Sequence, residues 1–330
     1  MTQTTQVGAI EFVEATAQET VAAQPTAADT QVSSRIAPWM KLGKLVDGVM
    51  TAEQAAKLGG IDFAVRAEPI YFSTKKDGAP PKFTKIEGRK AIIREDTGQW
   101  LSVVSKIYPI VQYGEAFDFI EGVSPNFVAA GALRGGKQGF MVVQTDVTLN
   151  IGDPHELFAV LRTSHDCSRA VEVSVMPLRG MCMNQLTLRS FSKGVDHRWA
   201  VHHSGDVKTK LAAAAASMSK LGAYARAYES NVQRLIGTKV SDEFATSTLM
   251  RVLPDRPKRP ETIERIISGW HNRPETVGYE GTGWGLVNAI SEYFEWDRQG
   301  GSPESRFLAA LQGQTPTAIN KTAGLILSRA

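Results

Sequence analysis

The sequence predicts an α+β protein, in which an antiparallel β-rich N-terminal half is followed by a helical C-terminal half. Between residues 61 and 205, runs rich in β-branched and aromatic residues recur at intervals too short for the crossovers of a parallel sheet. From about residue 206, apolar residues instead recur every three or four positions, the period of an amphipathic helix. The chain has 330 residues, 42% of them hydrophobic, which is enough for a large core.

The N-terminal half divides into a tail and a core domain. Residues 1–35 are rich in Thr, Ala and Gln, and we expect a disordered tail because such a segment buries too little apolar surface to offset its ordering entropy. Residues 36–205 are predicted to form the β-rich core domain, which starts with the order strand, strand, strand, helix. These first elements are expected in residues 61–72, 89–96, 97–111 and 114–123, and later strands in 131–149, 156–163, 170–183 and 198–203.

The C-terminal region, residues 206–330, is predicted to be helical and to pack on the core or follow it. A long amphipathic helix runs from about Val207 to Leu235, and Ser204 or Asp206 is suited to cap its N-terminus. Ser302-Pro303 is typical of a helix start, and Thr315-Pro316 favours a last short helix. Further helices are expected over residues 242–253, 261–270, 283–297 and 303–311.

Composition excludes several classes of protein. No apolar run is long enough to span a membrane, and the N-terminus lacks the pattern of a secretory signal, so we expect a cytoplasmic protein that does not bind membranes. Cys167 and Cys182 do not form a disulfide framework, and no Cys/His spacing fits a zinc site. The sequence contains neither G-x-G-x-x-G nor G-x-x-x-x-G-K-[ST], the two glycine motifs typical of nucleotide-binding sites, and it predicts no cofactor.

The charge is unevenly distributed along the chain. The net charge is +3, and residues 1–35 carry −3, with four acids against Arg35, so the remainder carries +6. A moderate positive charge on the folded part permits the binding of a polyanion.

The strongest candidate for a binding surface is the segment 189–210, in which basic and aromatic residues are interleaved. Cations neutralise phosphates and aromatic rings stack on bases, which is the combination that single-strand binders use. The alternative is an edge strand with solvated charges and a buried Trp199. The residues that we predict here are Arg189, Lys193, Arg198, Trp199, Lys208 and Lys210, with Trp199 as the stacking platform and the others as cations.

Two further basic stretches are candidates. The Gly-rich segment "GALRGGKQGF" carries Arg134 and Lys137, and a loop of this kind either lets a phosphate backbone approach closely or is a solvated hairpin loop. The second stretch, residues 251–265, is interrupted by three prolines and is predicted to be a linker between helices. Its positive charge would extend a surface that binds a polyanion. Its cations are Arg251, Arg256, Lys258, Arg259 and Arg265.

The stretch "LRTSHDCSRA", residues 161–170, places Ser164, His165 and Asp166 side by side between two predicted strands. Adjacent residues in one turn point in different directions, so they do not converge as a nucleophilic triad. We favour a polar hairpin turn in which Asp166 accepts hydrogen bonds from nearby backbone N–H groups. The alternative is that His165 acts as a general base with a remote partner.

Five ordered blocks within about residues 40–300 resemble the phage/plasmid-like protein family that has a domain of unknown function. They begin "GGIDFAVRAEPI", "RKAIIREDTGQW", "AAGALRGGKQGFMVVQ", "LRTSHDCSRAVEV" and "GTGWGLVNAISEYF". The resemblance implies that the protein is encoded on a mobile element and is located in a bacterial cytoplasm. It implies no established activity. The family pattern has glycine after the His-Asp pair where this chain has Cys167, so a shared mechanism would not use a cysteine there.

We therefore expect a nucleic-acid-binding protein of a phage or plasmid, which binds and anneals single-stranded DNA without ATP and forms a homo-oligomer. The strand-strand-strand-helix order is similar to the core of phage single-strand annealing recombinases, a likeness of fold alone. The sequence favours no enzyme, because no acid-base pair or metal set is evident. Two alternatives stay open: a hydrolase acting on nucleic acid through His165 and Asp166, with or without a metal, and a protein that binds a host factor and no nucleic acid.

Overall fold

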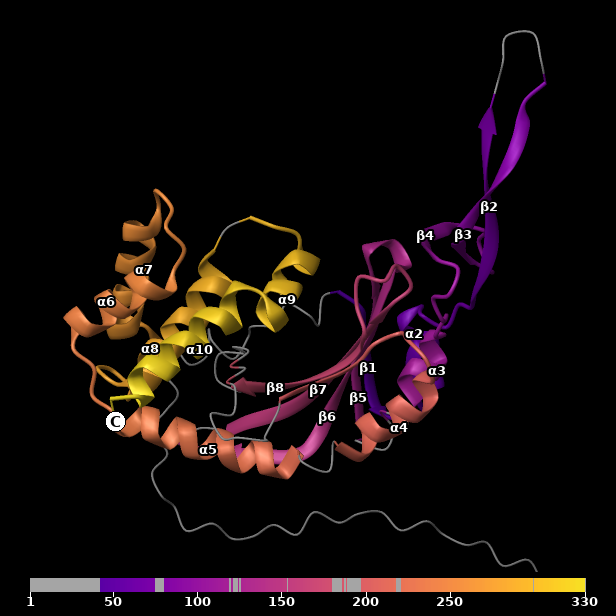
Figure 1. The fold of residues 1–330 in the computed structure, drawn as a ribbon. Coiled ribbons are helices and arrows are strands. Elements are labelled where there is room, and N and C mark those ends of the chain that lie inside the picture. The colour runs from indigo at the N-terminus through magenta and orange to yellow at the C-terminus, as the bar shows by residue number, and fades with distance from the viewer. Residues whose placement is uncertain are drawn as a thin grey trace, which may run out of the picture.

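The fold confirms the predicted order of a β-rich half followed by a helical half (Figure 1). The computed structural model describes residues 42–74, 80–118, 120, 124, 126–152, 154–179, 186, 188, 197–217, 221–298 and 300–329. The predicted tail, residues 1–35, lies outside this range. None of the described helices is long and apolar enough to cross a membrane.

The described strands form two antiparallel sheets. The larger has the strand order β1-β5-β6-β7-β8-β9 and the smaller the order β2-β3-β4. Strands β5 to β8 are successive hairpins, as the short intervals in the sequence predict, and β9 pairs antiparallel with β8 at the edge of the sheet. The bounds are β1 (Lys44–Val49), β2 (Val65–Thr74), β3 (Lys82–Arg94), β4 (Trp100–Ser105), β5 (Asn126–Leu133), β6 (Gln138–Asn150), β7 (Pro154–Ser164), β8 (Val171–Arg179) and β9 (Arg198–Val201).

Both faces of the larger sheet are buried. On β6, Phe140 and Val142 join a cluster with Phe307 of α9 (Pro303–Gln312), whereas Met141 and Val143 face the opposite cluster. That opposite face is covered by α2 (Ala52–Gly59), α3 (Tyr113–Phe117) and α4 (Val207–Ser217). Coverage on both sides explains why the central strands read as continuous apolar runs and do not alternate with polar residues.

The helical half packs on one end of this sheet. Strand residues Leu149, Leu157 and Val175 share a single buried cluster with helices α5, α8 and α10. In Figure 1, α5 runs beneath β6 and β7, and α10 lies beside α8. The remaining helical bounds are α5 (Leu221–Gly237), α6 (Asp242–Val252), α7 (Arg259–Asn272), α8 (Gly283–Glu292) and α10 (Gln314–Leu327), with a π-helical turn η6 (Tyr293–Asp297) after α8 and short 3₁₀ turns η3 (Arg134–Gly136) and η5 (Pro274–Thr276).

Several boundaries differ from the prediction. The helix expected over 207–235 is described as α4 and α5, with residues 218–220 between them outside the described part. The last helix, α10, has 14 residues where a short one was expected, because its apolar face packs on α8 and α9. Sequence patterns also missed β1 and α2, which are short elements held by contact with β5.

Strands β2 and β3 extend beyond the body of the protein as an arm (Figure 1). The pairing is regular from Val65 to Pro69, is interrupted opposite residues 86–89 and resumes from Tyr71 to Thr74. Gly88 lies in this interruption with φ of 78°, a left-handed conformation that glycine adopts without steric cost. Strand β4 pairs only with residues 89–93 of β3, so the outer part of the arm is a two-stranded ribbon.

Candidate nucleic-acid interface

Arg198 and Trp199 lie on β9, the edge strand of the larger sheet, and both make internal contacts. The Arg198 guanidinium donates to the buried carboxylate of Glu172, although its own side chain is half-exposed. Trp199 pairs with Val173 and is half-buried between the two main hydrophobic clusters. The indole is therefore partly packed into the core.

The other cations of segment 189–210 are described only in part. Arg189 and Lys193 lie outside the described residues, and Lys208 is placed on α4 without a described side chain. Lys210 is exposed, and its Nζ donates to the carbonyl oxygen of Ser204 at 2.6 Å and to the Ser204 hydroxyl at 3.2 Å. This ammonium holds the loop that precedes α4.

The Gly-rich loop between β5 and β6 is fixed in place by its backbone. Tyr113 Oη donates to the carbonyl of Gly136 at 2.9 Å, and His165 N donates to the carbonyl of Lys137 at 2.9 Å. Arg134, with φ of 52°, stays exposed, and its backbone N–H donates to Glu304 at 3.0 Å. The loop is thus a positioned turn, and both of its cationic side chains are at the surface or near it.

Lys137 lies over an exposed indole that the sequence analysis did not single out. Its Nζ is 5.2 Å from the centre of the Trp100 ring, at cation–π distance, and Trp100 is 60% exposed. Trp100 opens β4, 37 positions before Lys137 in the chain. The two hairpins therefore bring together a ring and a cation, the pair expected around Trp199.

Ser164, His165 and Asp166 form a hairpin turn, as the sequence analysis favours. Ser164 Oγ accepts from Arg169 N at 2.9 Å, and Asp166 Oδ1 accepts from Ser168 N at 3.0 Å. His165 is buried and stacks on Tyr113 with the ring centres 4.0 Å apart. The three side chains have separate partners.

Electrostatics of this turn oppose general-base chemistry. Burial lowers the pKa of His165 to about 3, and its Nε2 has no hydrogen-bond partner within the part of the chain that the structure describes. Burial also raises the pKa of the Cys167 thiol, which disfavours a thiolate. The described residues contain no group of three His, Cys, Asp or Glu side chains that could hold a metal ion.

His203, from the predicted segment, packs against the same turn. Its Nδ1 is 2.7 Å from the Tyr108 hydroxyl, and the two rings stack at 5.2 Å. Burial lowers the pKa of His203, so its neutral form is favoured. The ring pair supports the turn, because Tyr108 Oη also donates to the carbonyl of Ser164 at 3.2 Å.

The outward face of the smaller sheet gathers exposed apolar side chains. Register places Trp100 beside Ile93 and Val103 beside Ala91 on the face opposite the buried Ile92. Trp100 and Val103 are more than half exposed. On the arm, Tyr71 shares a face with Phe83, whereas Phe72 points to the other face, and all three rings are exposed.

The same sheet carries basic residues. Arg66 donates to Glu68 at 2.7 Å and Arg94 pairs with Asp96 at 2.6 Å, so two of these cations are neutralised locally. Lys82 and Arg89 are exposed and have no acidic partner among the described residues. We call this surface the small-sheet face: Arg66, Arg89, Trp100 and Val103 on the outward side of β2–β4, together with Arg134 and Lys137 of the adjoining loop.

A family profile described as a domain of unknown function (DUF932) matches residues 100–322, more than half of the chain. The chain belongs to the DUF932 family. The DUF932 domain begins at Trp100, and it includes the Gly-rich loop, the turn at 164–170 and strand β9. Strands β2 and β3, which form the arm, precede it. No curated protein and no solved structure matches the chain.

Proposed function

We propose that this protein binds nucleic acid, single-stranded DNA first of all, through the small-sheet face, and that it does so without ATP. The observation that carries the proposal is the exposed Trp100 ring with Lys137 Nζ at 5.2 Å. An exposed indole is a platform on which any base can stack, and the adjacent ammonium is suited to a phosphate. The exposed Arg134 of the same loop and the unpaired Arg89 of β3 add positive charge to this surface.

Other parts of the proposal rest on the sequence. The resemblance to phage and plasmid proteins supports an origin on a mobile element and a place in the bacterial cytoplasm, and annealing of complementary strands would be the activity. Neither glycine motif for nucleotide triphosphates is present, which supports independence from ATP. Segment 189–210 stays a second candidate contact, with Lys208 and Lys210 as its cations, but Arg198 is committed to Glu172.

The test is titration of fluorescent oligonucleotides, single- and double-stranded, without metal or ATP and at several salt concentrations. Binding of a single strand should weaken with salt, with a slope of log K against log salt of about −0.7 for each phosphate contact. Trp100→Ala should weaken binding about tenfold, since stacking of one base contributes about 1–3 kcal/mol. Lys137→Ala should make the slope shallower by about one contact.

Matched controls exist elsewhere on the surface. Met250 on α6 is about half-exposed and apolar, and Lys57 on α2 is exposed and basic. Met250→Ala and Lys57→Ala should leave affinity within twofold, because neither lies on the small-sheet face. If these controls and the Trp100 and Lys137 variants all bind equally well, or if affinity does not respond to salt, the proposal is wrong.

A second candidate function is assembly with another copy of this chain through the arm. The outer part of the arm pairs only with itself within the described residues, and exposed aromatic rings lie on both of its faces. Open strand edges of this kind pair readily with another strand. Light scattering should then give a mass above 35.9 kDa that falls to the monomer value in Phe83→Ser. A monomeric wild type would exclude this assembly.

The hydrolase that the sequence left open has no comparable support. His165 is neutral and buried, and Asp166 is engaged with Ser168. We therefore propose no catalytic role for this turn.

A further inference from the structure

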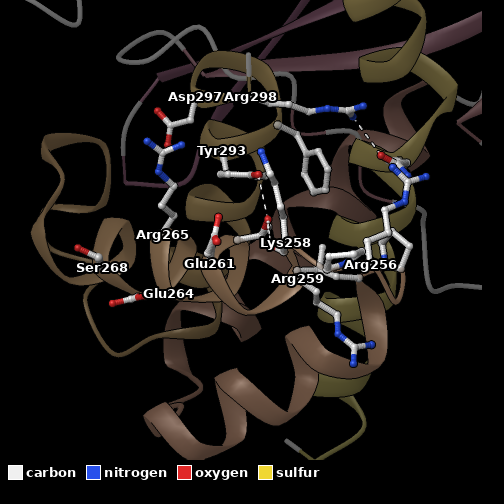
Figure 2. A pocket seen from close by; sticks show the side chains of 16 residues that line it. Arg256, Lys258, Arg259, Glu261, Glu264, Arg265, Ser268, Tyr293, Asp297 and Arg298 are labelled. Carbon is white, nitrogen blue, oxygen red and sulfur yellow. Dashed lines mark hydrogen bonds between the residues drawn. The ribbon is translucent and has the colours of Figure 1, made fainter. Parts of the chain in front are cut away.

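The second basic stretch lines a cleft in the helical half, far along the chain from the small-sheet face. The cleft has a volume of about 970 Å³ and is bounded by the α6–α7 connection, the first turns of α7, the π-helical turn η6 and the start of α10. Figure 2 shows its side chains, with Arg256 and Arg265 at opposite sides and Lys258 and Glu261 between them. Sites for small ligands are about 300–1,000 Å³, so this cleft has the size of one.

The wall of the cleft has an excess of positive charge. Five cationic and three acidic side chains line it. Asp297 is ion-paired with Arg273, and Arg259 with Asp255 at 3.1 Å, so these charges are largely satisfied. The side chains of Arg256, Lys258 and Arg265 have no hydrogen bond or ion pair with any described residue. Glu261 and Glu264 are the acids that offset them in part.

The backbone that carries Arg256 and Lys258 is restricted. Three prolines, at 254, 257 and 260, restrict the connection between α6 and α7. Helix α7 begins at Arg259 with Pro260 in its first turn and no side-chain cap, so the positive end of its dipole adds to the field in the cleft. Cations on a restricted loop lose less conformational freedom when they bind an anion than cations on an unrestricted loop do.

Aromatic side chains share the lining of the cleft with the cations. Tyr293 and Phe294 of η6 line the cleft and are only partly buried. Tyr293 Oη lies 3.1 Å from Thr262 Oγ1, which orients the phenol ring. Aromatic rings in the same cleft as unpaired cations suit a ligand that has both a planar ring and negatively charged groups.

We propose that this cleft binds the phosphate groups and base of a nucleoside phosphate. The phosphates would lie against Arg256, Lys258 and Arg265, and the base against Tyr293 or Phe294. The same chemistry is present in a free nucleotide and in the end of a nucleic-acid strand, and the test separates the two. The site is distinct from the small-sheet face and does not depend on nucleic-acid binding there.

The experiment is isothermal titration calorimetry of the full chain in metal-free buffer with ATP, adenosine, inorganic pyrophosphate and a four-nucleotide oligothymidine. ATP should bind, pyrophosphate more weakly and adenosine weakest, because both the phosphates and the base contribute. Arg256→Ala, Lys258→Ala and Arg265→Ala should each weaken ATP binding about tenfold, the effect of losing one charge-assisted hydrogen bond.

Arg251 supplies the matched control. It is an exposed cation on α6 from the same basic stretch, but it does not line the cleft. Arg251→Ala should bind ATP as the wild type does, and circular dichroism checks that every variant is folded. Trp100→Ala should also bind ATP normally, so that failure of the small-sheet proposal and failure of this one are separate results. No heat with any phosphate ligand, or equal affinity in all cleft variants, would overturn the assignment. A different result would also overturn it: no binding of ATP, together with binding of the oligonucleotide that persists in Trp100→Ala and is lost in Arg256→Ala. The cleft would then be a contact for nucleic-acid strands alone.

Discussion

Glu172 offers the sharpest test of the internal electrostatics, because one buried carboxylate satisfies several partners. Its side chain is 1% exposed, and it accepts from Arg162 at 2.7 Å and from Arg198 and Gln312. The Arg162 side chain is 2% exposed, whereas that of Arg198 is 46% exposed. Glu172→Gln keeps the shape but removes the charge, and it leaves Arg162 buried without a carboxylate.

The expected magnitudes follow from these exposures. Removing one partner of a buried ion pair costs about 3–5 kcal/mol, because the other charge stays buried and uncompensated. Arg198→Ala removes a half-exposed partner, and water screens such a pair, so we expect a loss of about 1 kcal/mol or less. The difference between the two variants should therefore be about 2–4 kcal/mol in the free energy of unfolding.

Urea denaturation followed by far-ultraviolet circular dichroism measures this difference. Glu156→Gln is the matched control, since Glu156 is exposed on the neighbouring strand β7, and it should change stability by no more than about 0.5 kcal/mol. If Glu172→Gln lowers the free energy of unfolding by no more than Arg198→Ala does, then the buried Arg162 does not need the charge of Glu172 and the reasoning is refuted.

Two predictions concern the turn at residues 164–170. The pKa of His165 is about 6.5 in the unfolded chain and about 3 in the folded protein, because burial disfavours the charged imidazole. Below pH 6.5 the unfolded chain therefore binds a proton that the folded protein does not. The free energy of unfolding is full above pH 6.5 and is lower by about 2.5 kcal/mol at pH 4.5. His165→Phe should flatten the dependence of the urea midpoint on pH over this range, and an unchanged slope would contradict the neutral buried imidazole. Cys167 has φ of 59°, a conformation that costs a residue with a side chain about 1–2 kcal/mol. Cys167→Gly should therefore raise the melting temperature slightly, and a decrease would show that the thiol makes a stabilising contact.

The sequence predicts the local part of the fold well. Strands β6 to β8 and the turn at residue 165 follow from short apolar runs separated by polar residues. Ser302 caps α9 by accepting from Ser305 N at 3.1 Å, as the Ser-Pro pair indicates. Such features depend on residues that are close together in the sequence, so a sequence pattern is enough to predict them.

The candidate site depends instead on which distant segments of the chain lie side by side in the fold, and a local sequence pattern does not predict this. Arg198 precedes Trp199 directly in the sequence, whereas the cation over Trp100 is the distant Lys137. Trp199 packs against two hydrophobic clusters, and Trp100 is exposed. Strict alternation counted back from Val103 would place the Trp100 side chain on the inward face, and a bulge between Trp100 and Ser102 places it instead beside Ile93 on the outward face. Only the coverage of the larger sheet on both sides decides which indole is available.

The contact between Gln312 and Glu172 has a consequence for how this protein can be divided. Gln312 ends α9, and its amide reaches both Glu172 of β8 and Arg169 of the hairpin turn. Strand residues such as Leu157 likewise share a cluster with Trp284 of α8. A fragment cut after residue 205 would expose a carboxylate and an apolar surface to water at once, so we expect the isolated N-terminal piece to aggregate and to recover its shape only when the missing helices are supplied in trans.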